Sequence, residues 1–464
     1  AAARPATPLT EKAKGYKLSS VNIEEIEYRD PLDLFALLRS ETEGPAFLLG
    51  GTSKGTSRSY SYIGVSPFMV IEGEADPFAA LSELLKKYKS EAGPFPFSGG
   101  AVGYFSYDLR DNLINTHAKG ETKKEAPLIA PSILGVYDTI VAIDHARQKS
   151  YLVERGFSGA GENSKMITAL AKEKKRFART EPKESGSAPR SNLTREEYIS
   201  KVEAAKRYIT EGDIYQINIA QKFEIPFNGD SFSLYRDIVE SSPAPFSSFL
   251  DFGSFQIISN TPERLLKIKD GTAVTEPIKG TRKRGASKAE DLILIEELRG
   301  SPKERAEHVM IVDLERSDLG RICETGTVKV EEFERVLTLP GLHHMVSSVR
   351  GRLKEGLTGP EALKMIFPGG SITGAPKIRA MEIIDELEPT PRGLYTGALG
   401  WFDFSGALDI AMAIRTAVSK EATLHLGVGS GIVADSVPEE EYDETILKAK
   451  DFFGAVNKEK KIAK

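Results

Sequence analysis

Hydrophobic and polar positions change their period several times along this chain, which predicts strands and helices in mixed order. In the first part, short apolar runs at 47–49, 60–65, 135–143 and 150–153 predict strands, the last two joined by a turn near Asp144 and His145. Residues 78–88 instead have the apolar spacing of a helix. This part should therefore consist mainly of strands and turns.

The second part opens with a helix signal and then alternates between the two periods. Thr194 and Glu197 have the spacing of a capping box, which predicts a helix to about residue 210. Strands are expected at 214–223, 255–258, 273–276, 397–402, 408–418 and 423–428, and helices near 289–299, 302–317, 359–366, 375–387 and 438–453. The order is not a regular βαβ rhythm, so the fold class expected is α+β.

A polar stretch at 180–192, rich in Ser, Pro and charged residues, cannot pack into a core and predicts a linker. No internal repeat is visible. We therefore divide the chain into a flexible tail (1–15), an N-terminal region (16–175), a linker (176–193), a C-terminal region (194–455) and a second tail (456–464).

Composition excludes several function classes. The 464 residues carry a net charge of −5, so no basic excess points to nucleic acid. The single cysteine excludes an intrachain disulfide framework, and with six histidines it argues against a closed zinc site. No apolar run reaches the roughly 18 residues that span a membrane, and the first fifteen residues do not form a secretory signal. We expect a protein of a reducing compartment, the cytoplasm, without membrane contact.

Two pairs of carboxylates have helical spacing. Glu304 and Glu307 lie three residues apart on one expected helix, and Glu441 and Glu444 lie three apart on another. This spacing places both members of a pair on one helical face. Two such faces that meet would suit Mg²⁺, which binds oxygen ligands and keeps several waters. The alternative for each pair is an ordinary solvated helix face.

Lys279 lies between a stiff Pro-Ile step and a Gly-Thr turn, and Arg282, Lys283 and Arg284 follow it. A lysine amine is a nucleophile only in its neutral form, which burial or neighbouring cations favour. Lys279 is therefore a candidate nucleophile, and the alternative is a solvated lysine in a basic loop.

Two glycine-rich segments and two other sites are further candidates for binding. Segment 427–431 follows a strand and segment 367–377 precedes a helix, so their backbone N–H groups suit an anion, or else form turns. In the expected strand 342–349, alternation would point only one of His343 and His344 inward. Arg415 follows an apolar run, and a buried arginine requires an acidic partner or ligand.

Taken together, several motifs resemble those of the chorismate-utilising enzymes. The similarity is close over 195–455 and looser over 16–175. It is carried by 212–218 (Gly-Asp-Ile-Tyr-Gln-Ile-Asn), 261–264 (Thr-Pro-Glu-Arg), 277–281, 304–319, 367–377 and 429–436. The resemblance implies an α+β fold of two large facing β-sheets with outer helices, in which the two regions intertwine.

Three positions are similar to one branch, the aminodeoxychorismate synthases (component I). Lys279 stands where anthranilate synthases typically have alanine and aminodeoxychorismate synthases have lysine. The sequence of 369–377 also looks like that of the aminodeoxychorismate synthases. Gln216 stands where isochorismate and salicylate synthases usually have a water-activating lysine. The resemblance implies Mg²⁺-dependent amination of chorismate to 4-amino-4-deoxychorismate through a covalent lysine intermediate, toward 4-aminobenzoate and folate. Alternatives are an anthranilate synthase component I and a non-catalytic chorismate-binding regulator.

The resemblance also implies a role for each matching residue. Glu263 would protonate the departing hydroxyl, Lys279 would be the nucleophile, and His344 would lie near the ring carboxylate. Substrate contacts would come from Gly280, Thr281, Tyr395, Arg415, Gly429, Ser430 and Gly431. Glu307 and Glu444 would bind Mg²⁺ directly, and Glu304 and Glu441 would bind it through water.

The source of ammonia would be a separate glutamine amidotransferase subunit in a heterodimer. This chain has no Gly-x-Cys-x-Gly nucleophile, because Cys323 lies in Arg-Ile-Cys-Glu-Thr. The N-terminal region departs from the pattern of many relatives, which hold tryptophan through a Leu-Leu-x-Ser motif and a downstream arginine. Here 48–51 is Leu-Leu-Gly-Gly and Ser59 replaces the arginine, although Pro-Phe-Ser remains at 245–247. This departure argues against a tryptophan site.

Overall fold

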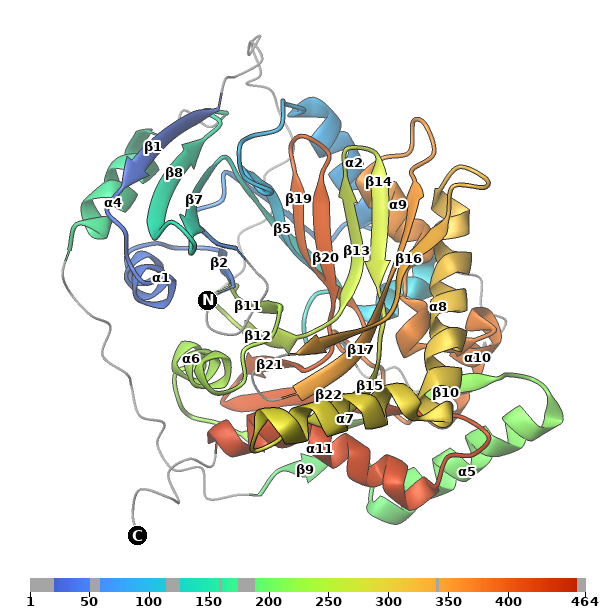
Figure 1. The fold of residues 1–464 in the computed structure, drawn as a ribbon. Coiled ribbons are helices and arrows are strands. Elements are labelled where there is room, and N and C mark those ends of the chain that lie inside the picture. Colours follow the sequence, from blue (N-terminus) through green and yellow to red (C-terminus); the bar gives the residue numbers. More distant parts are fainter. Residues whose placement is uncertain are drawn as a thin grey trace.

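The structure, a computed structural model, describes residues 21–50, 59–113, 126–157, 161–173, 188–338 and 342–456. Two large β-sheets face each other, and helices cover their outer sides (Figure 1). The expected α+β class with two facing sheets is confirmed. The tail predicted at 1–15, most of the predicted linker, Gly51 and the end of the chain from 457 lie outside the described residues.

The first sheet has twelve strands, and its two edge strands come from different regions of the sequence. In spatial order they are β1 (Asn22–Ile26), β8 (Lys149–Glu154), β7 (Thr139–Asp144), β3 (Tyr60–Gly64), β2 (Ala46–Leu49), β11 (Phe246–Asp251), β12 (Gln256–Thr261), β21 (Thr416–Lys420), β22 (Thr423–Ile432), β10 (Gln216–Pro226) and β18 (Gly374–Ala375), with β9 (Arg190–Ser191) beside β10.

The second sheet has ten strands. In spatial order they are β15 (Ile278–Lys283), β17 (Leu342–Arg352), β14 (Thr272–Glu276), β13 (Arg264–Lys269), β20 (Leu408–Met412), β19 (Ala398–Asp403), β5 (Gly100–Phe105), β6 (Ser132–Tyr137) and β4 (Met69–Glu72), with β16 (Lys329–Thr338) beside β17. The N-terminal and C-terminal regions share both sheets, because β2 pairs with β11 and β5 pairs with β19. The expected intertwining is thus observed.

Helices pack on the sheets in three groups. The outer side of the first sheet is covered by α1 (Pro31–Ser40), α4 (Gly161–Ala171), α6 (Ser231–Ser241) and α11 (Pro438–Val456). The second sheet is covered by α2 (Pro77–Lys87), α3 (Arg110–Leu113) after the 3₁₀ turn η1 (Tyr107–Leu109), α8 (Pro302–Ile322) and α9 (Gly359–Ile366). Near β10 lie α5 (Arg195–Glu211) and α10 (Lys377–Leu387), while α7 (Lys288–Gly300) lies beside β15.

Local sequence explains where these helices begin. Thr194 and Glu197 form the predicted capping box at the start of α5, with each side chain bonded to the other residue's backbone N–H. A glycine in the left-handed conformation, Gly212, ends the same helix. The helices predicted near 289–299, 302–317, 359–366, 375–387 and 438–453 are present as α7 to α11.

The apolar core between the sheets joins the two regions. Phe47 and Tyr62 of the first sheet pack with Val102, Tyr104 and Trp401 of the second in one buried cluster. Side chains of this cluster fill the space between the sheets, so the facing side of each sheet is buried. None of the helices in the described part of the chain combines the length and apolar character needed to span a membrane.

Four sequence predictions need correction. The runs 135–143 and 408–418 were each expected as one strand, but each is divided between the two sheets, as β6 and β7 and as β20 and β21. In the second case Arg415 has a φ of 50°, which breaks the strand. Part of the predicted linker, Arg190–Ser191, forms β9. His343 and His344 are both buried, because β17 is covered on both faces.

A buried ion pair connects the two regions at the end of β8. Arg155 is fully buried and donates to the Ser98 and Glu91 carbonyls at 2.9 and 2.8 Å. Its Nη2 lies 3.7 Å from Asp403 at the end of β19. A buried carboxylate without its cationic partner is costly.

We therefore expect Arg155→Met to lower the free energy of unfolding by about 3 kcal/mol, since it leaves Asp403 and two carbonyls without this guanidinium. Denaturant unfolding measures the change. Arg147→Met is the matched control, because this arginine is 68% exposed and pairs with a neighbour on the same turn. Equal midpoints for the parent and Arg155→Met would contradict the role of the ion pair.

Candidate functional site

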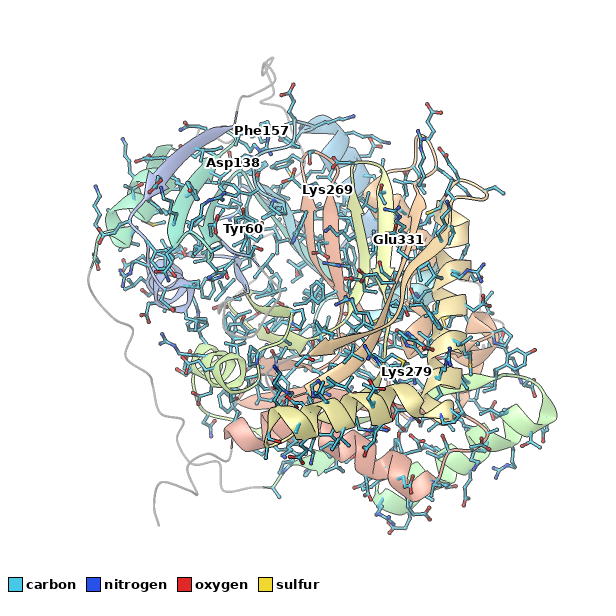
Figure 2. All side chains as sticks on the ribbon, in the orientation of Figure 1. Tyr60, Asp138, Phe157, Lys269, Lys279 and Glu331 are labelled. Atoms are coloured by element: carbon cyan, nitrogen blue, oxygen red, sulfur yellow. The ribbon has the colours of Figure 1, made fainter. Side chains whose placement is uncertain are left out.

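A pocket of about 180 Å³ opens where the end strands of the two sheets approach each other. Its walls come from β10 and β22 of the first sheet, from β15 and β17 of the second, and from α11. The 3₁₀ turn η2 (Gly370–Ile372) and the Pro262–Glu263 turn complete it. Figure 2 shows Lys279 at this end of the molecule, beside α8 and far from Asp138 and Phe157.

Most of the residues predicted from the sequence lie around this one pocket. They are Glu263, Lys279, Gly280, Thr281, His344, Tyr395, Arg415, Gly429, Gly431 and Glu444. Four predicted residues do not line it, namely Glu304, Glu307, Ser430 and Glu441. Segments far apart in the sequence therefore converge on a single cavity, whose lining runs from Asn218 to Lys448.

The Lys279 amine points toward α8 and β22. Its Nζ lies 3.2 Å from Oε2 of Glu307, and both side chains are about one-fifth exposed. A Cβ atom at position 431 would lie 3.0 Å from this Nζ, so glycine there leaves room for the amine. The two arginines that follow Lys279 in the sequence are engaged with other groups, because Arg282 pairs with Glu304 and Arg284 pairs with Asp291.

The carboxyl of Glu263 is the most perturbed acid of the pocket. Only 6% of the residue is exposed, and burial raises the pKa of Glu263 to about 7. A hydrogen bond from Ser371 and the charges of Lys279 and Lys448 act in the opposite direction. Burial prevails because it removes water from the charged form. At neutral pH a large share of Glu263 is protonated and able to donate a proton.

The pocket also contains neutral hydrogen-bonding groups. Burial lowers the pKa of His344 to about 4, so its imidazole is neutral, and its Nδ1 lies 3.0 Å from the Thr281 hydroxyl. Burial also raises the pKa of Tyr395 to about 12, so its phenol keeps its proton. These groups donate and accept hydrogen bonds without adding charge to the pocket.

Arg415 brings a positive charge to the pocket at the break between β20 and β21. Its side chain is 25% exposed, and its guanidinium lies 3.8 Å from Asp451. Burial lowers the pKa of Arg415, although the group remains charged at neutral pH. The left-handed backbone of this residue is unusual for a side chain of its size. Together with Lys279 and Lys448 it makes the pocket suitable for an anionic ligand.

The glycines of β22 bring backbone close to the ligand space. A Cβ at Gly429 would lie 2.6 Å from the Ile219 carbonyl oxygen and 2.8 Å from the Tyr395 hydroxyl. Ser430 faces the other side of the strand, where its hydroxyl lies 2.8 Å from that of Tyr198. Any contact of Ser430 with a substrate would therefore come from its backbone.

The four predicted magnesium ligands lie on α8 and α11, and of these only Glu444 lines the pocket. Oxygen Oε2 of Glu304 and Oε2 of Glu441 are buried without a hydrogen-bond partner in the described part of the chain. Burial raises the pKa of Glu441, and the neighbouring Glu444 adds to this. Within the described residues no three His, Cys, Asp or Glu side chains form a ready cation site. Ser436 and Ser430 also form hydrogen bonds to the Glu441 carboxyl. Each unpartnered oxygen is nevertheless a ligand of the type that Mg²⁺ binds, since this ion takes one or two direct carboxylates and keeps several waters.

Three side chains at the site were not singled out as site residues from the sequence. Lys448 lines the pocket, pairs with Glu444 at 2.6 Å and donates to the Gly429 carbonyl at 2.8 Å. Its four-residue spacing from Glu444 was the available signal. Ser371 contacts Glu263, and Asn218 lines the wall beside Tyr395. Neither serine nor asparagine in a loop or strand carries a distinctive sequence signal.

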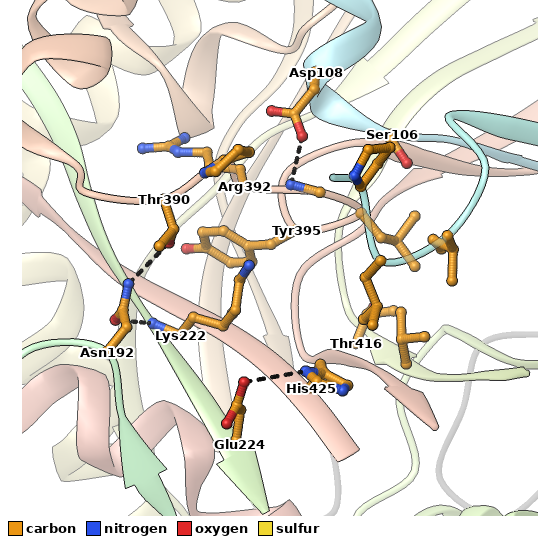
Figure 3. A pocket seen from close by; sticks show the side chains of 18 of the residues that line it. Ser106, Asp108, Asn192, Lys222, Glu224, Thr390, Arg392, Tyr395, Thr416 and His425 are labelled. Atoms are coloured by element: carbon orange, nitrogen blue, oxygen red, sulfur yellow. Dashed lines mark hydrogen bonds and ion pairs between the residues drawn. The ribbon is translucent and has the colours of Figure 1, made fainter. Parts of the chain in front are cut away.

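A second cavity of about 340 Å³ has Tyr395 among the residues that line it (Figure 3). It adjoins the pocket, because Tyr395 and Gly427 line both. Its polar groups are largely engaged with one another. Asp108 accepts from the Gly393 N–H at 2.8 Å, and His425 lies 4.0 Å from Glu224. The cavity lies between the two regions of the chain, because Ser106 and Pro131 line it from one side of the sequence and Arg392 and Val418 from the other.

Comparisons with known proteins agree with this geometry. The family described as chorismate binding enzyme matches residues 35–454. Anthranilate synthase component 1 of Aquifex aeolicus is 40% identical over 82% of this chain and 79% of its own length. Aminodeoxychorismate synthase component 1 of Klebsiella aerogenes is 39% identical over 81% of each chain.

A solved structure has the same arrangement. The crystal structure of anthranilate synthase component I from Streptococcus pneumoniae matches with a TM-score of 0.73 and 30% identity, over 86% of this chain and 93% of the other. This chain therefore belongs to the chorismate binding enzymes.

Proposed function

We propose that this chain is the synthase component of an aminodeoxychorismate synthase, which replaces the C4 hydroxyl of chorismate by an amino group. The observation that carries the proposal is the Lys279 amine in the wall of a pocket that also holds the buried acid Glu263. A nucleophile and a proton donor on one cavity are what a two-step displacement requires.

The charges of the pocket support a dicarboxylate substrate. Arg415, Lys448 and Lys279 bring three cationic side chains to a cavity of about 180 Å³. A guanidinium binds a carboxylate through paired hydrogen bonds, and the neutral His344 adds a further polar contact. Binding in one orientation would hold the ring close to the reacting groups, which is a large part of the rate gain.

The proposed reaction has two steps and passes through a covalent intermediate on Lys279. Once it has given up a proton, the Lys279 amine forms a bond to C2 of the ring, the double bonds shift, and the C4–oxygen bond breaks while Glu263 donates the proton that makes water. Ammonia then forms a bond to C4, the double bonds shift back, and the C2–nitrogen bond breaks so that Lys279 leaves as a free amine. The new C4 ammonium loses one proton, which returns to Glu263. Dividing one hard displacement into two steps is the gain of covalent catalysis.

Glu304, Glu307, Glu441 and Glu444 would hold a magnesium ion at the rim. When bound, Mg²⁺ would neutralise substrate carboxylate charge and fix its position. The orphaned oxygens of Glu304 and Glu441 support this placement. The division between direct ligands and ligands acting through water stays a prediction.

Ammonia would come from a glutamine amidotransferase partner. The one cysteine of this chain, Cys323, is 1% exposed, and burial raises the pKa of its thiol to about 11. Such a thiol is not a nucleophile at neutral pH, so this chain does not supply the glutaminase cysteine.

A second candidate is anthranilate synthase, because several of the similar proteins carry that name. That reaction also begins with amination of chorismate but ends with loss of pyruvate. Lys279 favours the first candidate, since an enzyme that aminates the ring directly with ammonia needs no amine of its own.

Given chorismate, Mg²⁺ and an ammonium salt, the chain alone should form 4-amino-4-deoxychorismate as the main product. Chromatography with mass detection identifies the product, and a coupled assay detects pyruvate. Anthranilate with an equal amount of pyruvate would establish the second candidate instead. Isochorismate would show that the site admits water as its nucleophile.

Lys279→Ala should lower ammonia incorporation at least about 100-fold, because the displacement would lose its covalent step. Mass spectrometry of enzyme quenched during turnover should find a substrate-sized adduct on the peptide that contains Lys279. Lys283→Ala is the control, since Lys283 is exposed on the same strand. Near-parental activity of Lys279→Ala, with no adduct in the parent, would reduce Lys279 to a binding residue.

Glu444→Gln should weaken Mg²⁺-dependent turnover strongly, because it removes one carboxylate charge from the proposed metal site. Its thermal midpoint should stay near the parent's, since partly exposed carboxylates contribute little to stability. Calorimetric titration with Mg²⁺ checks binding independently of turnover. The control is Glu440→Gln, an exposed glutamate on the same helix. Full activity of Glu444→Gln at low Mg²⁺ would exclude this metal site.

A further inference from the structure

A serine hydroxyl holds one oxygen of the buried acid. Oγ of Ser371 donates to Oε1 of Glu263 at 2.7 Å, and both residues line the pocket. Within the described residues no other hydrogen bond to the Glu263 carboxyl is formed. The second oxygen, Oε2, is therefore left to the pocket.

The turn that carries Ser371 is itself anchored by a buried lysine. Nζ of Lys377 donates to both carboxylate oxygens of Asp318, at 2.7 and 2.6 Å. It also donates to the carbonyls of Ile366 and Pro368, both at 2.9 Å. The two charged side chains are 11% and 6% exposed. The three N–H donors of this ammonium are shared among four acceptor oxygens and hold the backbone on both sides of η2.

Close packing on α8 restricts the same turn further. A Cβ at Gly370 would lie 2.5 Å from Cγ of Leu314 and 3.3 Å from Oδ2 of Asp318. The Gly370 N–H is also hydrogen-bonded to Asp318. Ser371 is thus presented to Glu263 by a turn that is held from two sides, and its hydroxyl direction is set by the fold.

We propose that Ser371 is a positioning residue for the proton donor: by donating to Oε1 of Glu263, it keeps the carboxyl proton on Oε2, which faces the substrate. A carboxylic acid has one proton, and an oxygen that already accepts a hydrogen bond is the poorer place for it. Lys377 and Asp318 act through Ser371 by holding its turn. The inference rests on the proposed role of Glu263.

The charged groups around Glu263 define the expected pH behaviour. The cations Lys279 on β15 and Lys448 on α11 and the bond from Ser371 stabilise the ionised form, while burial opposes it. Glu315 on α8 is a further acid facing this region, with a pKa raised to about 8 mainly by burial. Loss of the serine bond removes one stabilising contact to the ionised form, so the pKa of Glu263 should rise.

The test compares Ser371→Ala with Ser371→Thr, which keeps the hydroxyl. With Mg²⁺ and saturating ammonium, kcat of Ser371→Ala should fall about tenfold, with little change in KM for chorismate. A general acid is lost as pH rises through its pKa, so the alkaline limb of the profile should move upward by about one pH unit. Ser371→Thr should restore both values.

Two outcomes would overturn the inference, and each is distinct from failure of the proposed function. If the alkaline limb of the Ser371→Ala pH profile stays in place, Ser371 is a structural residue. If this variant has a raised KM with unchanged kcat, Ser371 is a substrate contact. Glu263→Gln serves as the separate check on the function: if it remains active, Glu263 is not the acid. If it is inactive while Ser371→Ala behaves like the parent, only the positioning role fails.

Discussion

Burial of one carboxyl group in a pocket of cations is the constraint on which the site depends. Glu263 lies where solvent is largely excluded, yet Lys279 and Lys448 act on the same carboxyl. Desolvation and these charges oppose each other, and the balance brings the pKa of Glu263 to about 7. A group with this pKa can both hold and release a proton at neutral pH, which is the property that a general acid needs.

The two-sheet architecture creates this environment. Glu263 lies in the turn between β12 of the first sheet and β13 of the second, so the chain crosses from one sheet to the other at the acid. The break at Arg415, between β20 and β21, is a second crossing of the same kind. The pocket thus forms where strands leave one sheet for the other, and there side chains can point into a gap that neither sheet fills.

Sequence patterns indicated the helices, the strands and most of the site residues. They did not indicate which apolar runs are divided between the two sheets. The capping box at Thr194 and the helices α7 to α11 depend on local signals, and these predictions are confirmed. The continuous apolar runs at 135–143 and 408–418 gave no sign of a change of sheet, because both halves of each run are buried. Motif resemblance brought together Glu263, Lys279 and Arg415, whereas Ser371 and Lys448 depend on contacts that only the folded chain shows.

The central claim is that Glu263 is a buried acid poised near neutrality, and its titration tests this most directly. Infrared difference spectra of the free protein, with Glu263→Gln subtracted, isolate the carbonyl band of the protonated carboxyl across a pH series. The account predicts a band that is strong at pH 6 and disappears with a midpoint of about 7. A midpoint near the ordinary glutamate value of about 4.3 would contradict it, because the carboxyl would then be fully ionised at neutral pH.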